Sequence, residues 1–225
     1  MQPTRGRHFD AIGIAEFLEG QGFSNPDAAA RARAVLERDG KTNPRKQGIA
    51  IAKIASASTL LQATLARICE ACSRLHPDAA SGREPVIVKA EDCELCRGSN
   101  NRRAARVALN ALQQAEVRHV LVVGGWPTAL VELRDALTDP AIDLRLVEGR
   151  KGLRPISSVE RDLSWADVLV VWGNTPLDHA LSEPYTSRAR AGKFRTPKLT
   201  VQGGVEAFCR ELHRHAERRR AATAR

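Results

Sequence analysis

The residues best suited to chemistry in this sequence are four cysteines that form two pairs. Cys69 and Cys72 make one Cys-x-x-Cys pair, and Cys93 and Cys96 make a second, with residues 73–92 between them. Each pair can present two thiolates at neighbouring corners of a tetrahedron, so two pairs complete a four-sulfur site. This spacing predicts one zinc ion per chain in a structural role, because four thiolates leave no open position for a substrate.

Spacing alone leaves other uses of these cysteines open. An iron–sulfur cluster takes the same ligands. A redox pair normally lies between a strand and a helix of a βαβ unit, a setting that neither pair resembles. Disulfides need an oxidising compartment, whereas Met1 to Asp10 is polar and lacks a signal-peptide core, which predicts a cytoplasmic protein. The fifth cysteine, Cys209, is expected to be a small buried hydrophobe in a helix over residues 205–220.

The composition indicates a polyanionic partner. The chain has 225 residues, with 35 Lys and Arg against 26 Asp and Glu, a net charge of +9 and a pI near 9.9. Such an excess favours a nucleic acid, a nucleotide or another polyanion as a partner. An arginine-rich surface that is merely solvated would give the same totals. No apolar run is long enough to cross a bilayer, so no membrane partner is expected.

Residues 1–66 are expected to form a helical region that resembles a helix-turn-helix. Apolar spacing predicts a first helix that ends near Gly20, and Asn25-Pro26 opens a second helix that stops at Gly40. A third, longer helix is expected to run to Ile68 and directly into the first cysteine pair. The alternative is a small helical bundle used for dimerisation or docking.

Residues 67–115 are expected to form a zinc module with an arginine-rich helix. A short strand at Val86–Val88 lies between the cysteine pairs, and the second pair leads into a helix over residues 100–115. Over residues 69–110 this order resembles treble-clef and GATA-type zinc modules. The resemblance implies groove or phosphate contacts from the first turns of that helix.

Cations in the helical region and around this helix are the candidate nucleic-acid contacts, because clustered guanidinium groups and helix starts both favour phosphate. A solvated helix face is the alternative for such a run of charge. The candidates are Arg31, Arg45, Lys46, Arg97, Arg102, Arg103 and Arg106.

Strands alternate with helices from residue 116 to 220, which predicts an α/β domain. The expected strands are Val117–Val123, Leu144–Val147, Asp167–Trp172 and Lys198–Val201. Alternation of this kind predicts a four-stranded parallel sheet with helices on both faces, a three-layer Rossmann-like domain. The expected strand order is 2-1-3-4, and residues 221–225 are expected to form a disordered tail.

Glycine-containing segments follow each strand and suggest a ligand crevice. In doubly wound sheets, ligands bind at the carboxyl ends of the strands where the strand order reverses. Neither a Gly-x-Gly-x-x-Gly fingerprint nor a Walker-A loop is present, and the alternative is that the glycines only form tight turns while the tryptophans pack. The candidate residues for a nucleotide-like ligand are Gly124, Gly125, Trp126, Arg150, Lys151, Gly173, Asn174 and Thr175.

The same domain resembles a bacterial family of Rossmann-like proteins whose activity is undefined. The resemblance covers residues 117–212. It is carried by Val122-Val123-Gly124-Gly125, Gly149-Arg150-Lys151-Gly152, the strand Ala166–Val171, the polar segment 174–179 and Gly203-Gly204. It implies a fold and no particular activity.

Two functional classes follow from the sequence. The first is a zinc-containing DNA-binding accessory or regulatory protein, a homodimer whose Rossmann-like domain dimerises or senses a ligand. The second is an enzyme or sensor that acts on a nucleotide-like molecule. The best catalytic set combines a His general base with neighbouring polar groups, but no nucleophile elbow or His-Glu-x-x-His motif accompanies it, so the first class is favoured. That set is Glu148, Arg150, Asn174, Thr175, Asp178 and His179.

Overall fold

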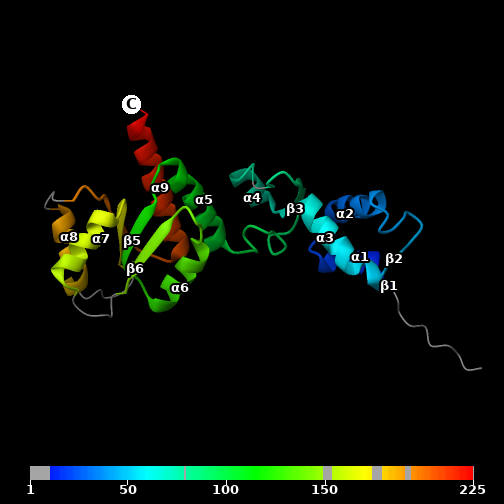
Figure 1. Cartoon of the computed structure of the whole chain (residues 1–225), viewed down its shortest axis with the longest axis horizontal. Helices are drawn as coiled ribbons and strands as arrows, with labels where there is room; N and C mark the ends of the chain where they lie inside the picture. The colour runs from blue at the N-terminus through cyan, green and yellow to red at the C-terminus, as the bar shows by residue number, and fades with distance from the viewer. Residues whose placement is uncertain (1–10, 79, 149–153, 174–178, 191–193, 225) are drawn as a thin grey trace, which may run out of the picture. The chain divides into compact units, whose positions relative to one another are not determined.

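The computed structural model describes residues 11–78, 80–148, 154–173, 179–190 and 194–224. The chain divides into two compact units, Met1–Ser99 and Asn100–Arg225. Each unit has its own hydrophobic core. Figure 1 labels most of the helices and strands of both units.

The first unit combines short helices with two small sheets. Its elements are β1 (Ala11–Gly13), α1 (Ile14–Gly20), α2 (Pro26–Arg38), β2 (Gly48–Ala50), η1 (Ile51–Lys53), α3 (Ile54–Thr64), β3 (Leu65–Ile68), α4 (Glu70–Leu75) and β4 (Glu84–Ile87). Strands β1 and β2 pair antiparallel, and β3 and β4 pair in parallel. The helices pack through buried Phe17, Leu36 and Leu61, which belong to one core.

Helix α2 begins and ends at the residues that the sequence signals predict. The Asn25 side chain accepts a hydrogen bond from the backbone N–H of Ala28 at 2.8 Å, and Pro26 occupies the first helical position. Beyond the helix, Gly40 has a φ of 66°, and the backbone N–H of Lys41 donates to the Leu36 carbonyl. A left-handed residue at this place closes the helix.

The expectation of one long helix running to Ile68 is wrong. Helix α3 ends at Thr64, and residues 65–68 form strand β3, which pairs with β4 in the register Leu65↔Glu84 to Ile68↔Ile87. Apolar residues in this stretch fit a helical period, but a short strand buried against a distant partner gives the same sequence pattern. A strand therefore leads into the first cysteine pair.

The second unit contains the four-stranded parallel sheet that the sequence predicts. Its elements are α5 (Asn100–Gln114), β5 (His119–Gly124), α6 (Pro127–Ala136), β6 (Asp143–Val147), α7 (Ile156–Trp165), β7 (Val168–Trp172), α8 (His179–Arg190), β8 (Lys198–Val201) and α9 (Val205–Thr223). The spatial order is β6-β5-β7-β8, which places the second strand of this sheet at one edge. All three pairings are parallel.

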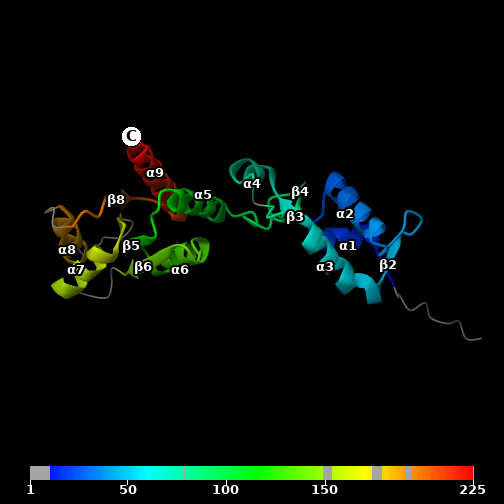
Figure 2. The same ribbon diagram turned by 45° about the horizontal axis from the view of Figure 1, so that its top comes forward.

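Helices cover both faces of this sheet (Figures 1 and 2). Val120 and Val122 of β5 point toward the core shared with α5, α6 and α9, whereas Leu121 and Val123 point toward the core shared with α7. This alternation is the period of a strand. Helix α5 packs on α9 in the first of these cores, so the arginine-rich helix belongs to the second unit.

Candidate metal centre

The four paired cysteines lie together in the first unit. Their Sγ atoms are all within 4.8 Å of one another, and all four side chains are buried. The Sγ atoms of Cys69 and Cys96 are 3.8 Å apart. A tetrahedral site with metal–sulfur bonds of about 2.3 Å has sulfur–sulfur edges of about 3.8 Å. The cluster is therefore positioned to hold a metal ion.

Local backbone geometry presents each pair of thiols. Cys69 caps the start of α4, and Cys72 lies in the first turn of that helix. After the second pair the chain turns back through Arg97 and Gly98, whose φ values are 48° and 78°. The backbone N–H of Arg97 donates to the Cys93 carbonyl at 3.0 Å, which closes this turn. Both pairs thus point their sulfur atoms inward from tight turns.

The thiols perturb one another's protonation. Burial raises the pKa of Cys69, but hydrogen bonds from the backbone and side chain of Cys72 and from the other thiols outweigh it and lower that pKa to about 7. The pKa of Cys72 is raised by burial and by the same neighbouring thiols. Metal binding at this cluster would release the thiol protons, because the thiolate is the form of cysteine that binds a metal.

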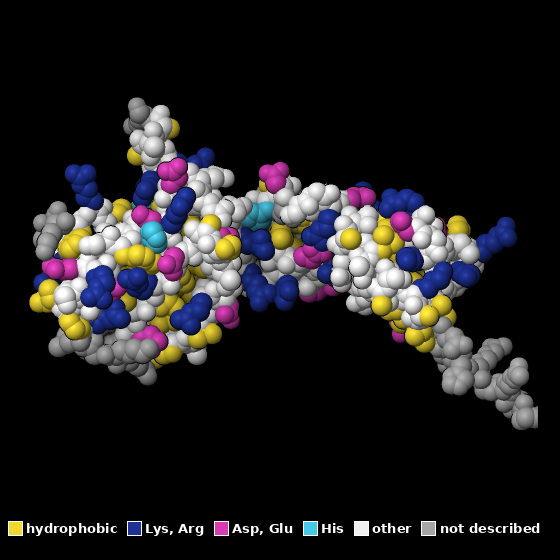
Figure 3. All heavy atoms as spheres, in the orientation of Figure 1, with side chains coloured by type: hydrophobic (Ala, Val, Ile, Leu, Met, Phe, Trp, Pro, Cys, Tyr) yellow, Lys and Arg dark blue, Asp and Glu magenta, His cyan; other side chains and the backbone are white. Residues whose placement is uncertain are grey.

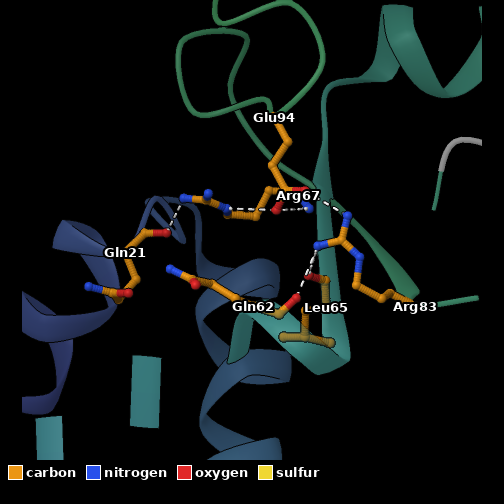
Figure 4. Close-up of polar contacts among 6 residues, drawn as sticks. All are labelled: Gln21, Gln62, Leu65, Arg67, Arg83 and Glu94. Atoms are coloured by element: carbon orange, nitrogen blue, oxygen red, sulfur yellow. Dashed lines mark hydrogen bonds and ion pairs between the residues drawn. The ribbon is translucent and has the colours of Figure 1, made fainter. Parts of the chain in front are cut away.

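Glu94, between the two cysteines of the second pair, is the centre of a polar network (Figure 4). Its Oε1 accepts from the backbone N–H and Nε of Arg67 at 3.2 and 3.3 Å, and its Oε2 accepts from Nη2 of Arg83 at 2.8 Å. Burial raises the pKa of Glu94, but the hydrogen bonds from Arg83 and Arg67 prevail and hold it below its usual range. The sequence analysis did not identify this residue.

The two arginines carry the network onward to other elements (Figure 4). Arg83 Nη1 donates to the carbonyls of Gln62 at 3.0 Å and Leu65 at 3.2 Å, at the junction of α3 and β3. Arg67 Nη1 donates to the carbonyl of Gln21, just after α1. The second cysteine pair is thereby tied to the ends of two helices of the first unit.

The cysteine cluster and the helices share one hydrophobic core. The four cysteines belong to the same buried cluster as Phe17 of α1, Leu36 of α2 and Leu61 of α3. The sequence suggested a boundary at residue 66, between a helical region and a separate zinc module. In the structure both parts lie in the compact unit Met1–Ser99.

Of the predicted nucleic-acid contacts in the first unit, two lie on an exposed loop. Arg45 and Lys46 belong to the segment 41–47, named here the basic loop, and neither side chain pairs with another described residue. Arg33 Nη2 holds the loop by donating to the carbonyls of Pro44 and Lys46 at 3.1 and 3.2 Å. Arg31, by contrast, pairs with Glu84 at 3.1 Å.

The remaining predicted contacts divide between the units. Arg97 is an exposed residue of the first unit, whereas Arg102, Arg103 and Arg106 belong to α5 in the second. Arg103 is half-buried, and its Nη1 donates to Asn100 Oδ1 at 3.0 Å. Figure 3 shows Lys and Arg side chains spread over the visible face of both units, with Asp and Glu among them.

The predicted crevice is described only in part. Gly124 is the last residue of β5 and Gly125 follows it, Gly173 follows β7, and Trp126 is 43% exposed at the start of α6. Arg150, Lys151, Asn174, Thr175 and Asp178 lie outside the described residues, as does the His179 side chain. Gly125 has a φ of 86°, and a Cβ there would lie 2.8 Å from the Trp172 ring. This glycine makes room for a buried tryptophan.

The sequence matches no protein-family model and no curated protein. In the described part of the chain, no helix is both long enough and apolar enough to cross a bilayer. The functional class of the protein therefore rests on its own residues, of which the cysteine cluster is the most specific set.

Proposed function

We propose that this protein is a zinc-containing accessory or regulatory protein that binds nucleic acid, DNA in particular, through its first unit. The second unit serves dimerisation or ligand sensing. The observation that carries the proposal is the buried cluster of four thiols in the same compact unit as the basic loop. The metal stabilises the fold of the first unit, and the basic loop contacts the phosphates of the nucleic acid.

Zinc suits this cluster better than other metals that proteins commonly bind. Four thiolate ligands select zinc or iron–sulfur over the hard, oxygen-preferring cations. Full ligation by the protein makes the site structural, since no position remains for a substrate or water. Metal analysis of protein purified under reducing conditions is expected to give about one zinc per chain. Iron with visible charge-transfer absorption, or no metal at all, would contradict this assignment.

The basic loop supports contact with phosphates. Residues 41–47 include Lys41, Arg45 and Lys46 and no acidic residue. The loop is held at both ends, because Arg33 binds its later carbonyls and Lys53 Nζ donates to the Gly40 carbonyl at 3.2 Å. A fixed loop loses little conformational entropy when it binds. Neutralised phosphates release counterions, which makes such binding salt-dependent.

A salt titration against random duplex DNA tests this function. The apparent affinity is expected to fall linearly with salt on a log–log scale, and Arg45→Ala with Lys46→Ala should reduce the slope by about two. The matched control is Arg74→Ala with Lys89→Ala, which removes the same charge from exposed positions of the same unit. Absence of binding at moderate salt, or equal losses in the two double variants, would refute the role of the loop.

A further inference from the structure

The second unit carries a surface hollow that none of the predicted sites includes. Its volume is about 390 Å³, and it lies at the amino ends of β7 and β8, the opposite edge of the sheet from the predicted crevice. The end of α7, the segment 194–197 and Arg219 of α9 form its walls. Hollows of a few hundred Å³ accommodate small molecules.

Two arginines from different elements line this hollow. Arg195 comes from the segment that enters β8, and Arg219 comes from the last turns of α9. Within the described residues, neither guanidinium group contacts a carboxylate. Other arginines of α9 are paired along the helix, as Arg220 is with Glu217 at 3.0 Å. Two cations that line the same hollow attract an anion into it.

The carboxylate that lines the hollow offsets only part of the charge of the two arginines. Among the described residues that line it, the only carboxylate is that of Asp167. Its Oδ2 accepts from the backbone N–H groups of Arg118 and His119 at 2.8 and 2.9 Å, and it lies 3.4 Å from Nδ1 of His119. That carboxylate is therefore committed to the start of β5. The hollow keeps an excess of positive charge.

The walls of the hollow include both polar and apolar side chains, and one hydrogen bond joins two of its segments. Thr196 Oγ1 donates to the Leu163 carbonyl at 2.8 Å, which ties the segment 194–197 to the end of α7. Half-buried Phe194 supplies an apolar wall beside the arginines. Arg219 also lines a second hollow of about 460 Å³.

We propose that this hollow binds a small phosphorylated molecule, with its phosphate group between Arg195 and Arg219. Guanidinium groups match phosphate oxygens with paired hydrogen bonds, and two of them from separate elements fix its position. The remainder of the molecule lies against Phe194. This site goes beyond the nucleic-acid role of the first unit and does not depend on the metal.

Calorimetry and thermal unfolding of the full chain test the site with inorganic phosphate, ribose 5-phosphate and AMP. Adenosine and ribose serve as unphosphorylated controls. The phosphorylated probes are expected to bind and to raise the unfolding temperature of the second unit, and the controls are not. Arg195→Ala and Arg219→Ala should each weaken binding about tenfold or more, because each removes charge-assisted hydrogen bonds. Arg218→Ala, an exposed neighbour on α9, should retain wild-type affinity.

Three results would overturn the proposal. The first is that no phosphorylated probe binds the wild-type chain, whose folded state is checked by circular dichroism. The second is that Arg218→Ala weakens binding as much as Arg219→Ala does, which would indicate general charge attraction. The third is that only duplex DNA binding responds to Arg195→Ala and Arg219→Ala, which would make this surface a nucleic-acid contact. The nucleic-acid role proposed for the first unit is tested separately, by the DNA binding of the basic-loop variants.

Discussion

Glu94 is the residue that joins the second cysteine pair to the rest of the first unit. Its side chain is 23% exposed, and its partners Arg67 and Arg83 are 26% and 28% exposed. Partly buried ion pairs of this kind are costly to break on one side only, because the remaining charges lose their partner while staying away from water. The three side chains therefore form one ion-pair network that stabilises the first unit.

Replacing the Glu94 carboxylate with an amide tests how much this network contributes to stability. Glu94→Gln is expected to lower the free energy of unfolding of the metal-loaded first unit by about 1–3 kcal/mol, since two arginines lose a charged acceptor. Glu84→Gln is the control, because Glu84 pairs with Arg31 at an exposed position and should cost less than about 0.5 kcal/mol. Urea unfolding of both variants measures the difference. Equal effects would show that Glu94 is an ordinary surface charge.

Gly125 is a residue whose missing side chain matters for packing. Its φ of 86° is unfavourable for other residues, and a Cβ would come within 2.8 Å of Trp172. Gly125→Ala is expected to destabilise the second unit by about 2–4 kcal/mol through backbone strain and overpacking. Gly173→Ala is the control, since a Cβ there would lie 3.7 Å from the Val201 carbonyl oxygen, an ordinary contact. A stable Gly125→Ala protein in thermal unfolding would contradict this account.

At the scale of elements, α9 contains a buried titratable group. His215 is 8% exposed, and its Nε2 has no hydrogen-bond partner in the described part of the chain. Burial lowers the pKa of His215, and the nearby charges of Arg218 and Arg219 lower it further. The folded protein therefore holds this imidazole neutral at a pH where the unfolded chain would bind a proton.

Acidification should consequently destabilise the packing of α9. As the pH falls below about 6.5, the ordinary pKa of histidine, the unfolded state gains a proton that the folded state resists, so the free energy of unfolding decreases. Above that pH the effect is absent. His215→Leu is expected to show a weaker loss of stability between pH 7.5 and 5.5 than the wild type in urea unfolding. His213→Leu, a half-exposed neighbour, is the control, and identical pH slopes in all three proteins would refute the assignment.

Elements set by local signals were predictable from the sequence, and those set by distant partners were not. Asn25-Pro26 and Gly40 marked the bounds of α2, because caps and left-handed turns depend on a few adjacent residues. The four thiols likewise follow from two short spacings. Strand β3 depends on β4, which lies in a separate part of the sequence, and no local pattern specifies that pairing. The Glu94 network depends on distant partners in the same way.

At the scale of the whole molecule, the four-cysteine cluster and the four-stranded sheet belong to different cores. All four paired cysteines lie in the core of the first unit with residues of α1, α2 and α3. The cores of the second unit contain the sheet and its covering helices, together with the fifth cysteine, Cys209. The cysteine spacing alone predicts that metal loss unfolds at least residues 66–110. Because the four cysteines share a core with α1, α2 and α3, we expect metal loss to unfold these helices as well. The effect should not reach α5, which belongs to the second unit.

Metal removal should therefore unfold one unit and spare the other. Under reducing conditions, a chelator is expected to abolish hydrogen-exchange protection in α1, α2 and α3 as well as around the cysteines, because a structural metal contributes its binding energy to folding. Protection in β5, β7 and α9 should persist. Cys93→Ser should reproduce this pattern without a chelator, whereas Cys209→Ala should keep its metal and weaken only the second unit, whose core contains that side chain. Helices α1–α3 that stay protected in metal-free protein would show that their packing is sufficient alone and that the metal serves only the turns that bind it.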